Sequence, residues 1–271
     1  MSFKNNRIDA KFAGLKKENK KAFIAFITAG YPSLAQTEKL VIALDEAGAD
    51  IVELGVPFSD PMADGPVIQC SSQQALRNGT TLKLILALVK RLRRRTDIPL
   101  CLMTYYNPVL SYGERRFASE AAAAGVDGII VPDLPPEEAK GLRSECAERG
   151  VHNIFFVSPT TTRKRMKKVA ALSGGFIYYL SVTGVTGARA SLPEDAGRQV
   201  RILRGLTSKP VCMGFGISTP EQVRSVCRAA DGAIVGSAIV GQIGKCRGKQ
   251  GCNIARETGR FVSALVKGAH V

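Results

Sequence analysis

The stretch ELGVPFSDPMADGP, residues 53–66, constrains the fold and the chemistry of this 271-residue chain more than any other segment. It directly follows the run Asp50-Ile51-Val52, which is typical of a strand. Its prolines fix φ and its glycines open the left-handed region, so we predict a loop of defined shape rather than a flexible one. An acid-bearing loop at the C-terminal end of a strand is where α/β barrels place their catalytic groups. The alternative is an ordinary solvated turn that happens to be acidic.

Outward from this loop, short apolar runs alternate with longer amphipathic segments along the chain. The strand-like runs are residues 22–28, 51–54, 99–104, 128–131, 153–157, 175–181, 210–213 and 232–235. The helix-like segments are residues 34–47, 82–95, 114–124, 136–149, 163–171, 193–205, 220–228 and 254–267. Helices between successive strands imply parallel strands, because a parallel connection requires a crossover. Eight β and eight α units predict an α/β fold of one domain, residues 1–271, closed as a (β/α)8 TIM barrel.

An open, doubly wound sheet is the alternative architecture. It is disfavoured because no G-x-G-x-x-G sequence follows the first predicted strand. The segment at residues 7–16 predicts an extra N-terminal helix with one apolar face, which we expect to close the bottom of the barrel.

The chain carries a net charge of +15, and its densest basic run is at residues 91–95. This run ends a predicted helix, where cations complement the helix dipole, and no aromatic residues interleave with it. We therefore expect no nucleic-acid partner, although a basic surface favours encounter with a phosphorylated substrate. No apolar run reaches membrane-spanning length and no signal sequence is visible, so we expect a soluble, cytoplasmic protein without membrane contact.

The cysteines and histidines suggest no metal chemistry. The seven cysteines are scattered without a C-x-x-C pair, so neither a disulfide framework nor a zinc site is expected. His152 and His270 are the only histidines, and we expect both to be structural, with His270 in a frayed tail. Histidine-centred triads and metal sites are therefore disfavoured. Residues 244–252 are predicted to form a loop before the last helix.

Glycine-bearing loops follow the last three predicted strands. They are residues 184–187, 214–218 and 236–238. Glycine lets backbone N–H groups approach an anion closely, and a helix N-terminus adds positive potential. Because the loops after strands seven and eight of a barrel commonly bind phosphate, we predict a site for a small phosphate monoester. The alternative is that these glycines are ordinary turns.

Several motifs together resemble the tryptophan synthase alpha subunit. They are residues 53–66, FITAGYP at 26–32, VPDLP at 131–135, YYLSVTGVTGARA at 178–190, GFGIS at 214–218 and VGSAIV at 235–240. The likeness runs from about residue 7 to the end of the chain. It implies a barrel that cleaves indole-3-glycerol phosphate to indole and glyceraldehyde 3-phosphate, with no cofactor of its own. It also implies a separate beta subunit, which holds pyridoxal phosphate and consumes the indole within an alpha2-beta2 heterotetramer.

The resemblance also assigns roles to residues of this chain. It places the catalytic acids at Glu53 and Asp64. The implied substrate-binding residues are Phe23, Tyr105, Tyr178 and Phe215 around the indole, Gly184, Gly216, Gly236 and Ser237 at the phosphate, and Thr186 in a closing loop. The implied partner-interface residues are Asp60, Pro61 and Asp133.

The implied reaction needs two acids with different properties. One must protonate the indole C3 and then accept the proton of the side-chain hydroxyl, while the other must stay ionised beside the ring N–H. Glu53 ends a strand, so we expect it to be buried with a raised pKa; Asp64, on a loop, is expected to stay charged and to move. The alternatives are a structural hydrogen-bond network for Glu53, a helix cap for Asp64 and plain barrel core for Tyr178.

Two kinds of rival function remain open at this point. One is a related phosphate-binding barrel, either an isomerase of the same pathway or a stand-alone lyase that releases free indole. The other is a non-catalytic activator of a beta subunit, which the presence of both Glu53 and Asp64 disfavours.

Overall fold

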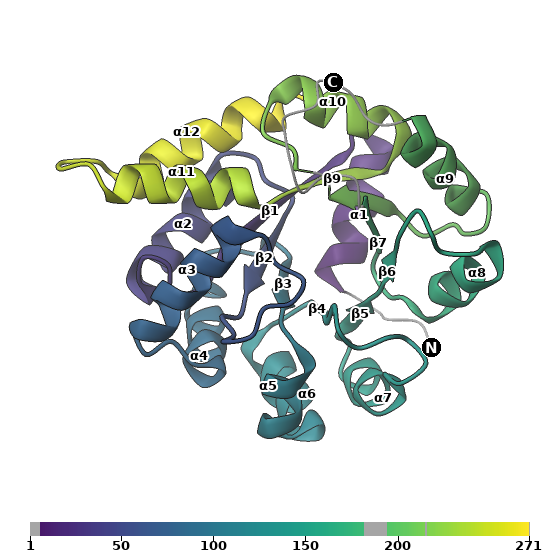
Figure 1. Ribbon diagram of the computed structural model, residues 1–271, viewed down its shortest axis with the longest axis horizontal. Coiled ribbons are helices and arrows are strands. Elements are labelled where there is room, and N and C mark those ends of the chain that lie inside the picture. The colour runs from purple at the N-terminus through teal and green to yellow at the C-terminus, as the bar shows by residue number, and fades with distance from the viewer. Residues whose placement is uncertain (1–5, 182–193, 215, 271) are drawn as a thin grey trace.

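The strands form a closed parallel barrel (Figure 1). The computed structural model describes residues 6–181, 194–214 and 216–270. Within these ranges the strands are β1 (Ala22–Thr28), β2 (Ile51–Gly55), β3 (Leu100–Met103), β4 (Gly128–Ile130), β5 (His152–Ile154), β6 (Phe156–Val157), β7 (Ile177–Leu180), β8 (Val211–Gly214) and β9 (Gly232–Val235). All pairings are parallel, in the order β5-β4-β3-β2-β1-β9-β8-β7-β6.

The two ends of this order are neighbours in the chain. Only Phe155 separates β5 from β6, so the predicted strand at 153–157 is one barrel strand interrupted at a single residue. Its first half pairs with β4 and its second half with β7, which closes the sheet. The predicted eight-stranded barrel is therefore confirmed, with one strand split in two.

Helices surround the barrel, and several strands are followed by two of them (Figure 1). The described helices are α1 (Arg7–Lys17), α2 (Leu34–Glu46), α3 (Pro66–Arg77), α4 (Leu82–Leu92), α5 (Tyr106–Tyr112), α6 (Glu114–Ala124), α7 (Lys140–Glu148), α8 (Arg163–Leu172), α9 (Glu194–Arg204), α10 (Pro220–Ala229), α11 (Ser237–Arg247) and α12 (Ile254–Val266). Of these, α3, α5 and α11 are additional to the eight helices expected from the β/α repeat. Only Gly236 separates the end of β9 from the start of α11, which places the N-terminus of this helix at the end of the barrel where chemistry is expected.

The N-terminal helix α1 closes the bottom of the barrel, as predicted. Asn6 caps it by accepting a hydrogen bond from the backbone N–H of Ile8 at 2.9 Å. Ile8, Phe12 and Leu15 lie on one face of α1 and pack against the inward-facing side chains of the strands. This seals the barrel interior from the end opposite the acid-bearing loop.

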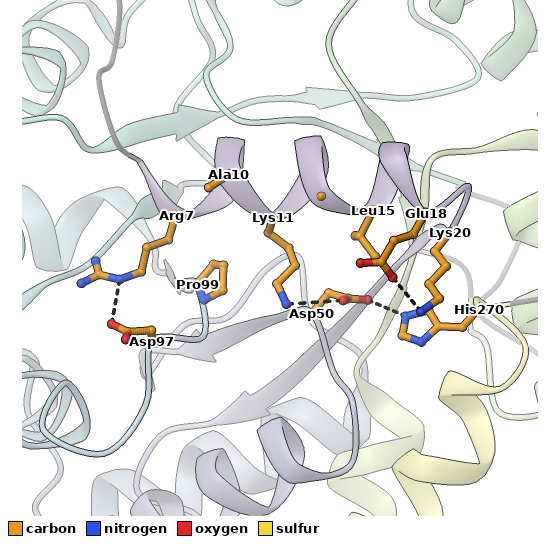
Figure 2. A pocket seen from close by; sticks show the side chains of 11 residues that line it. Arg7, Ala10, Lys11, Leu15, Glu18, Lys20, Asp50, Asp97, Pro99 and His270 are labelled. Carbon is orange, nitrogen blue, oxygen red and sulfur yellow. Dashed lines mark hydrogen bonds and ion pairs between the residues drawn. The ribbon is translucent and has the colours of Figure 1, made fainter.

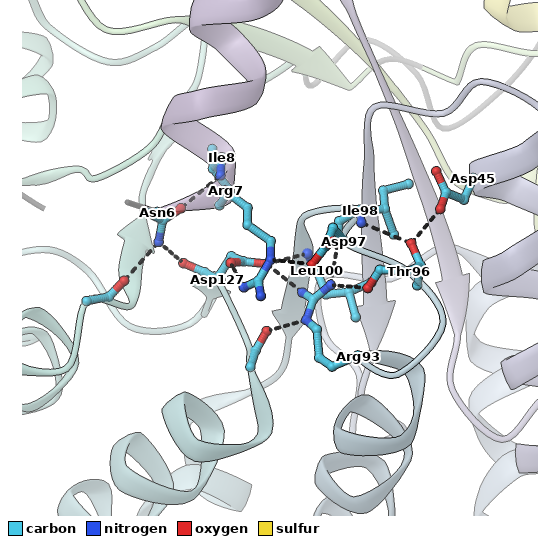
Figure 3. A network of polar contacts seen from close by, with 12 residues as sticks. Asn6, Arg7, Ile8, Asp45, Arg93, Thr96, Asp97, Ile98, Leu100 and Asp127 are labelled. Atoms are coloured by element: carbon cyan, nitrogen blue, oxygen red, sulfur yellow. Dashed lines mark hydrogen bonds and ion pairs between the residues drawn. The ribbon is translucent and has the colours of Figure 1, made fainter. Parts of the chain in front are cut away.

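A polar network ties the start of α1 to the basic run at residues 91–95 (Figure 3). Asp127 accepts hydrogen bonds from Arg7 at 3.1 Å and from Arg93 at 2.6 Å, and its side chain is 4% exposed. Arg91 and Arg95 both pair with Glu38. Three arginines of the basic run therefore have partners within the chain, in keeping with a structural role for it.

Two expectations for the C-terminal part of the chain were wrong. His270 is not frayed: its Nε2 lies 2.9 Å from Asp50, which Lys11 approaches from the other side at 3.7 Å (Figure 2). Residues 244–247 continue α11 instead of forming a loop. Cys246, in the last turn of α11, forms a disulfide with Cys252, while the other described cysteines are free thiols. The spacing of this pair does not correspond to a C-x-x-C motif and gave no signal in the sequence.

No helix in the described ranges is both long enough and apolar enough to cross a membrane.

Candidate active site

A cavity of about 380 Å³ opens at the C-terminal end of the barrel strands. Its walls are formed by Phe26, Ala63, Asp64, Ile68, Met103, Tyr178, Leu180, Ser181, Gly214, Gly216, Ile217, Ile234, Gly236 and Ser237. They come from loops and strand ends far apart in sequence. Apolar side chains therefore surround a few polar groups, which is the usual character of a small-molecule site.

A larger cavity of about 430 Å³ lies at the opposite end, beside α1 (Figure 2). Its charged groups pair with one another, as Arg7 does with Asp97 and Lys11 with Asp50. Catalytic groups of α/β barrels lie at the C-terminal end of the strands, so the smaller cavity is the candidate active site.

Glu53 points into the barrel interior beneath this cavity. Its Cα partners are Phe26 on β1, which lines the cavity, and Cys101 on β3, which belongs to the inner core. Residues in register on neighbouring parallel strands point to the same face of a sheet, and Ile51, two residues earlier, is also an inner-core residue. The β2 strand therefore fixes the Glu53 carboxyl group inside the barrel.

The Glu53 carboxyl group is buried without a hydrogen bond from any described residue. The residue is 0% exposed, and neither carboxyl oxygen has a hydrogen-bond partner among the residues that the structure describes. Burial raises the pKa of Glu53 to about 8 from its ordinary value of 4.5. The side chain is therefore predominantly protonated at neutral pH, as expected for a general acid. An acid that served a structural hydrogen-bond network would have partners, so this alternative is not supported.

Asp64 lines the cavity from the loop between β2 and α3. Its Oδ2 accepts a hydrogen bond from the hydroxyl of Tyr105 at 3.2 Å. It does not cap α3, because Gly65 is the N-cap residue and makes no side-chain capping bond. Burial raises the pKa of Asp64, and the Tyr105 hydrogen bond partly opposes this shift. On balance the pKa of Asp64 is raised, whereas we expected this acid to stay ionised. A positive charge on a bound substrate would favour the carboxylate.

Tyr178 lines the cavity and lies within electrostatic range of both acids. It lines the cavity from β7, and its ring packs on Phe156 with a centroid distance of 4.7 Å. Burial raises the pKa of Tyr178 well above its ordinary value, and the charges of Glu53 and Asp64 both add to this shift. The charges of both acids therefore reach the Tyr178 hydroxyl. Tyr178 belongs to the barrel core and also lines the cavity. A role in the core is therefore compatible with a role in binding substrate.

The predicted phosphate residues lie on the opposite wall. Gly216, Gly236 and Ser237 all line the cavity. Gly236 is the N-cap of α11 and Ser237 its first residue, and the glycine has no side chain that could cap the helix. Among the described residues, the N–H groups of this first turn and the positive end of the helix dipole are therefore available to an anion in the cavity. By contrast, Gln222 accepts hydrogen bonds from the N–H groups of Ser218 and Thr219, so the start of α10 is already occupied.

Some predicted substrate residues lie elsewhere or cannot be placed. Gly184, Thr186 and Phe215 fall outside the described residues. The prediction for Phe23 was wrong, because its side chain is buried in the layer between strands and helices. Phe26, on the same strand, faces the cavity instead, and a Cβ at Gly55 would come within 2.5 Å of its ring. The absence of a side chain at this glycine therefore gives the aromatic ring its space.

Tyr105 also differs from its predicted role. It is 5% exposed and is not among the described residues that line the cavity. Its contact is with the catalytic loop rather than with the space for an indole ring. Several apolar wall residues were not predicted from sequence, namely Ile68, Met103, Leu180, Ile217 and Ile234.

The predicted partner residues lie in loops at the same end of the barrel. Asp60 is exposed and Pro61 half-buried in the loop after β2, and Asp133 is exposed in the loop after β4. Met62, next to Pro61 in this loop, is 88% exposed.

The described residues contain no group of three or more His, Cys, Asp or Glu side chains that could hold a metal ion. Both histidines instead pair with carboxylates, His152 with Asp9 at 2.8 Å and His270 with Asp50 at 2.9 Å.

Comparisons with known proteins agree with this arrangement. A family model described as tryptophan synthase alpha chain matches residues 12–266. The tryptophan synthase alpha chain of Citrifermentans bemidjiense is 53% identical over 263 residues, covering 97% of each chain. That of Geobacter sulfurreducens is 52% identical over 261 residues, covering 96% of this chain and 97% of the relative.

Solved structures give the same result. The subunit alpha of tryptophan synthase from Legionella pneumophila superimposes with a TM-score of 0.91 at 36% identity, with 98% of each chain covered. A chain of Mycobacterium tuberculosis tryptophan synthase has a TM-score of 0.90 at 34% identity, covering 99% of this chain and 100% of that chain. With the barrel, the paired acids and the near full-length matches taken together, this chain belongs to the tryptophan synthase alpha chain family.

Proposed function

We propose that this chain is a lyase that splits indole-3-glycerol phosphate into indole and glyceraldehyde 3-phosphate, the alpha reaction of L-tryptophan biosynthesis. Glu53 is the general acid and base, and Asp64 stabilises the charge on the ring. The observation that carries these roles is the Glu53 carboxyl group, which is fully buried, has no hydrogen-bond partner among the described residues and lies on the inner face of the barrel beneath the cavity that Asp64 lines. A protein keeps so costly a group where its chemistry requires it.

The cavity suits the shape and charge of this substrate. The indole ring lies between the apolar walls that Phe26, Met103 and Ile234 contribute. The phosphate accepts hydrogen bonds from the N–H groups at the start of α11, next to Gly236 and Ser237. Substrate held at both ends brings its C3 atom over the carboxyl group that β2 fixes in the barrel.

The protonated Glu53 donates its proton to the indole C3, and positive charge develops at the ring nitrogen. The carboxylate of Asp64 stabilises this charge beside the ring N–H. The ionised Glu53 then accepts the proton of the hydroxyl on the carbon attached to C3. The carbon–carbon bond breaks as the aldehyde forms, and its electron pair restores the aromatic ring. Glu53 ends the cycle protonated, so no proton is gained or lost by the enzyme.

An indole-release assay on the full chain tests this function. With indole-3-glycerol phosphate we expect indole and glyceraldehyde 3-phosphate in equal amounts. With the dephosphorylated substrate we expect kcat/KM to fall by about 100-fold or more, because charge-assisted hydrogen bonds to the α11 amides are lost. Equal kcat/KM for both substrates would contradict the phosphate assignment. Conversion of a sugar phosphate of the same pathway without indole release would instead support the isomerase alternative.

The partner of this chain is proposed to be a tryptophan synthase beta subunit, in a cytoplasmic alpha2-beta2 heterotetramer. Its contact surface would include Asp60, Pro61 and Asp133, which lie in loops at the same end of the barrel as the active site. The beta subunit would hold pyridoxal phosphate and consume the indole, and this chain would need no cofactor. A matching M. tuberculosis structure is described as tryptophan synthase and not as its alpha chain alone, which supports a larger assembly for that relative.

Binding of the beta subunit is expected to raise the rate of indole release by this chain. Asp60 and Asp64 share one loop, so a partner that orders the first also positions the second. The measurement is indole release with and without the cognate beta subunit, supplied without its second substrate so that indole accumulates. Equal turnover in both conditions would contradict this prediction. A chain that is inactive in both conditions but stimulates the beta reaction would be a non-catalytic activator.

A further inference from the structure

The loop that carries Asp64 is bonded through two of its groups to one side chain from beyond the next strand, Tyr105. Tyr105 lies two residues after the end of β3, at the N-cap position of α5. Its hydroxyl accepts a hydrogen bond from the backbone N–H of Ala63 at 2.9 Å and donates one to Asp64 Oδ2 at 3.2 Å. One oxygen atom therefore fixes both the backbone before the acid and the carboxylate itself.

The ring of Tyr105 holds the other end of the same loop. It stacks on Phe58, with ring centroids 5.2 Å apart and an angle of 30° between the planes. Phe58 and Asp64 stand near the two ends of the loop between β2 and α3. Stacking of this kind stabilises a contact beyond the area that it buries, so the ring restrains the loop independently of the hydroxyl.

Tyr105 is itself anchored. Asp133 accepts a hydrogen bond from the backbone N–H of Tyr106 at 2.9 Å, which fixes the first turn of α5 immediately after Tyr105. The tyrosine is 5% exposed, so few other positions are open to its ring. A rigid support of this kind is what a catalytic group on a loop requires, because its geometry must be held within a fraction of an ångström.

We propose that Tyr105 is the positioning residue of the reaction, which aims the Asp64 carboxylate at the ring nitrogen of the substrate and does not itself contact the indole. The inference rests on the proposed function, since Asp64 is the group positioned. Tyr105 acts through Asp64 because it lies behind the loop and not among the described residues that line the cavity.

The hydroxyl also favours the ionised form of Asp64. Its hydrogen bond lowers the pKa of Asp64, while burial, the larger effect, raises it. The other titratable groups near this pair are Asp133, whose charge acts on Tyr105, and Tyr178, on which the charges of both Asp64 and Glu53 act. Loss of the hydroxyl must therefore raise the pKa of Asp64. Activity falls at low pH because the Asp64 carboxylate becomes protonated. This acidic limb of the pH–rate profile therefore moves to higher pH when the hydroxyl is removed.

The test is Tyr105→Phe, which keeps the ring and its stacking and removes only the hydroxyl. The matched control is Tyr106→Phe, whose hydroxyl donates to Glu114 at 3.0 Å, away from the cavity. We expect Tyr105→Phe to lower kcat for indole release by about 10- to 100-fold with little change in KM, as loss of one hydrogen bond to a charged group implies. The acidic limb is expected to move upward. Tyr106→Phe is expected to match the wild type in kcat and in the position of the acidic limb.

Three outcomes would overturn the proposal. A raised KM with unchanged kcat would make Tyr105 a substrate contact, and an unchanged kcat and pH limb would leave it without a role in catalysis. Loss of the cooperative melting transition in Tyr105→Phe would make its role structural.

NMR titration of the Asp64 carboxyl carbon, which does not depend on any reaction, is expected to show a higher pKa in Tyr105→Phe. Failure of the wild type to release indole, with this NMR shift present, would count against the proposed function and not against the Tyr105 contact.

Discussion

Replacing Glu53 by glutamine is expected to lower kcat for indole release by at least about a thousandfold, since general acid–base catalysis commonly contributes factors of 10²–10⁴. Glutamine has nearly the same size and shape but cannot donate its proton and recover it. Substrate binding should persist, because the cavity walls and the start of α11 are unchanged. The measurement is steady-state kcat and KM for indole release by the full chain. Near-normal turnover in this variant would contradict the assignment of Glu53.

The same variant is expected to fold and to become relatively more stable as the pH rises. Burial raises the pKa of Glu53 from 4.5 to about 8, so between these values the folded wild type keeps a proton that the unfolded chain has lost. The wild type therefore loses up to about 1.4 kcal/mol of stability per pH unit across this window. Glutamine does not titrate. The unfolding free energy of the Glu53→Gln variant should therefore rise relative to that of the wild type up to about pH 8 and then level off. Parallel pH profiles would show that the Glu53 pKa is not raised.

Replacing Asp64 by asparagine is expected to lower kcat by about 10²–10³-fold, the effect of removing one group that stabilises charge in a transition state. The amide keeps a hydrogen-bond acceptor for Tyr105 and loses only the negative charge. A matched control is Asp97→Asn, which removes an equal charge at the bottom of the barrel from a side chain that is 93% exposed. This control should keep wild-type kcat. If both variants lose activity equally, overall charge and not the position of Asp64 is responsible.

The β/α repeat allowed the barrel to be predicted, because each strand-like run is followed by a helical one. The interruption of the strand at Phe155 and the short helix α5 gave no comparable signal. Both depend on tertiary packing, which overrides local propensity over a few residues. The same holds for the disulfide between Cys246 and Cys252, whose six-residue spacing has no distinctive pattern.

The acids could be found from sequence because their loop is unusual, whereas the apolar walls could not. In strand β1 all seven residues are buried, so no alternation of polar and apolar residues marks the inner face. Phe23 and Phe26 differ by an odd number of positions and therefore point to opposite faces. Sequence reasoning selected the wrong one of the two. The role of Tyr105 was likewise hidden, since the hydrogen bond joins residues 41 positions apart.

The arrangement also explains why two acids of similar type can act differently in one cavity. Glu53 is fixed on a strand without hydrogen-bond partners among the described residues, so burial alone sets its pKa. Asp64 lies on a loop, where burial also raises its pKa but the Tyr105 hydrogen bond offsets part of this rise. Among the described residues a hydrogen bond therefore favours the carboxylate at Asp64 and none does so at Glu53, a difference in environment of the kind that separates the roles of paired carboxyl groups.

The most direct test is a crystal structure of the Glu53→Gln variant with intact indole-3-glycerol phosphate bound. We predict that the phosphate accepts hydrogen bonds from the N–H groups at the start of α11, beside Gly236 and Ser237. The residue 53 side chain should lie at the indole C3, and Asp64 at the ring nitrogen. A phosphate bound elsewhere, or an indole ring that contacts only one of these two side chains, would contradict the account.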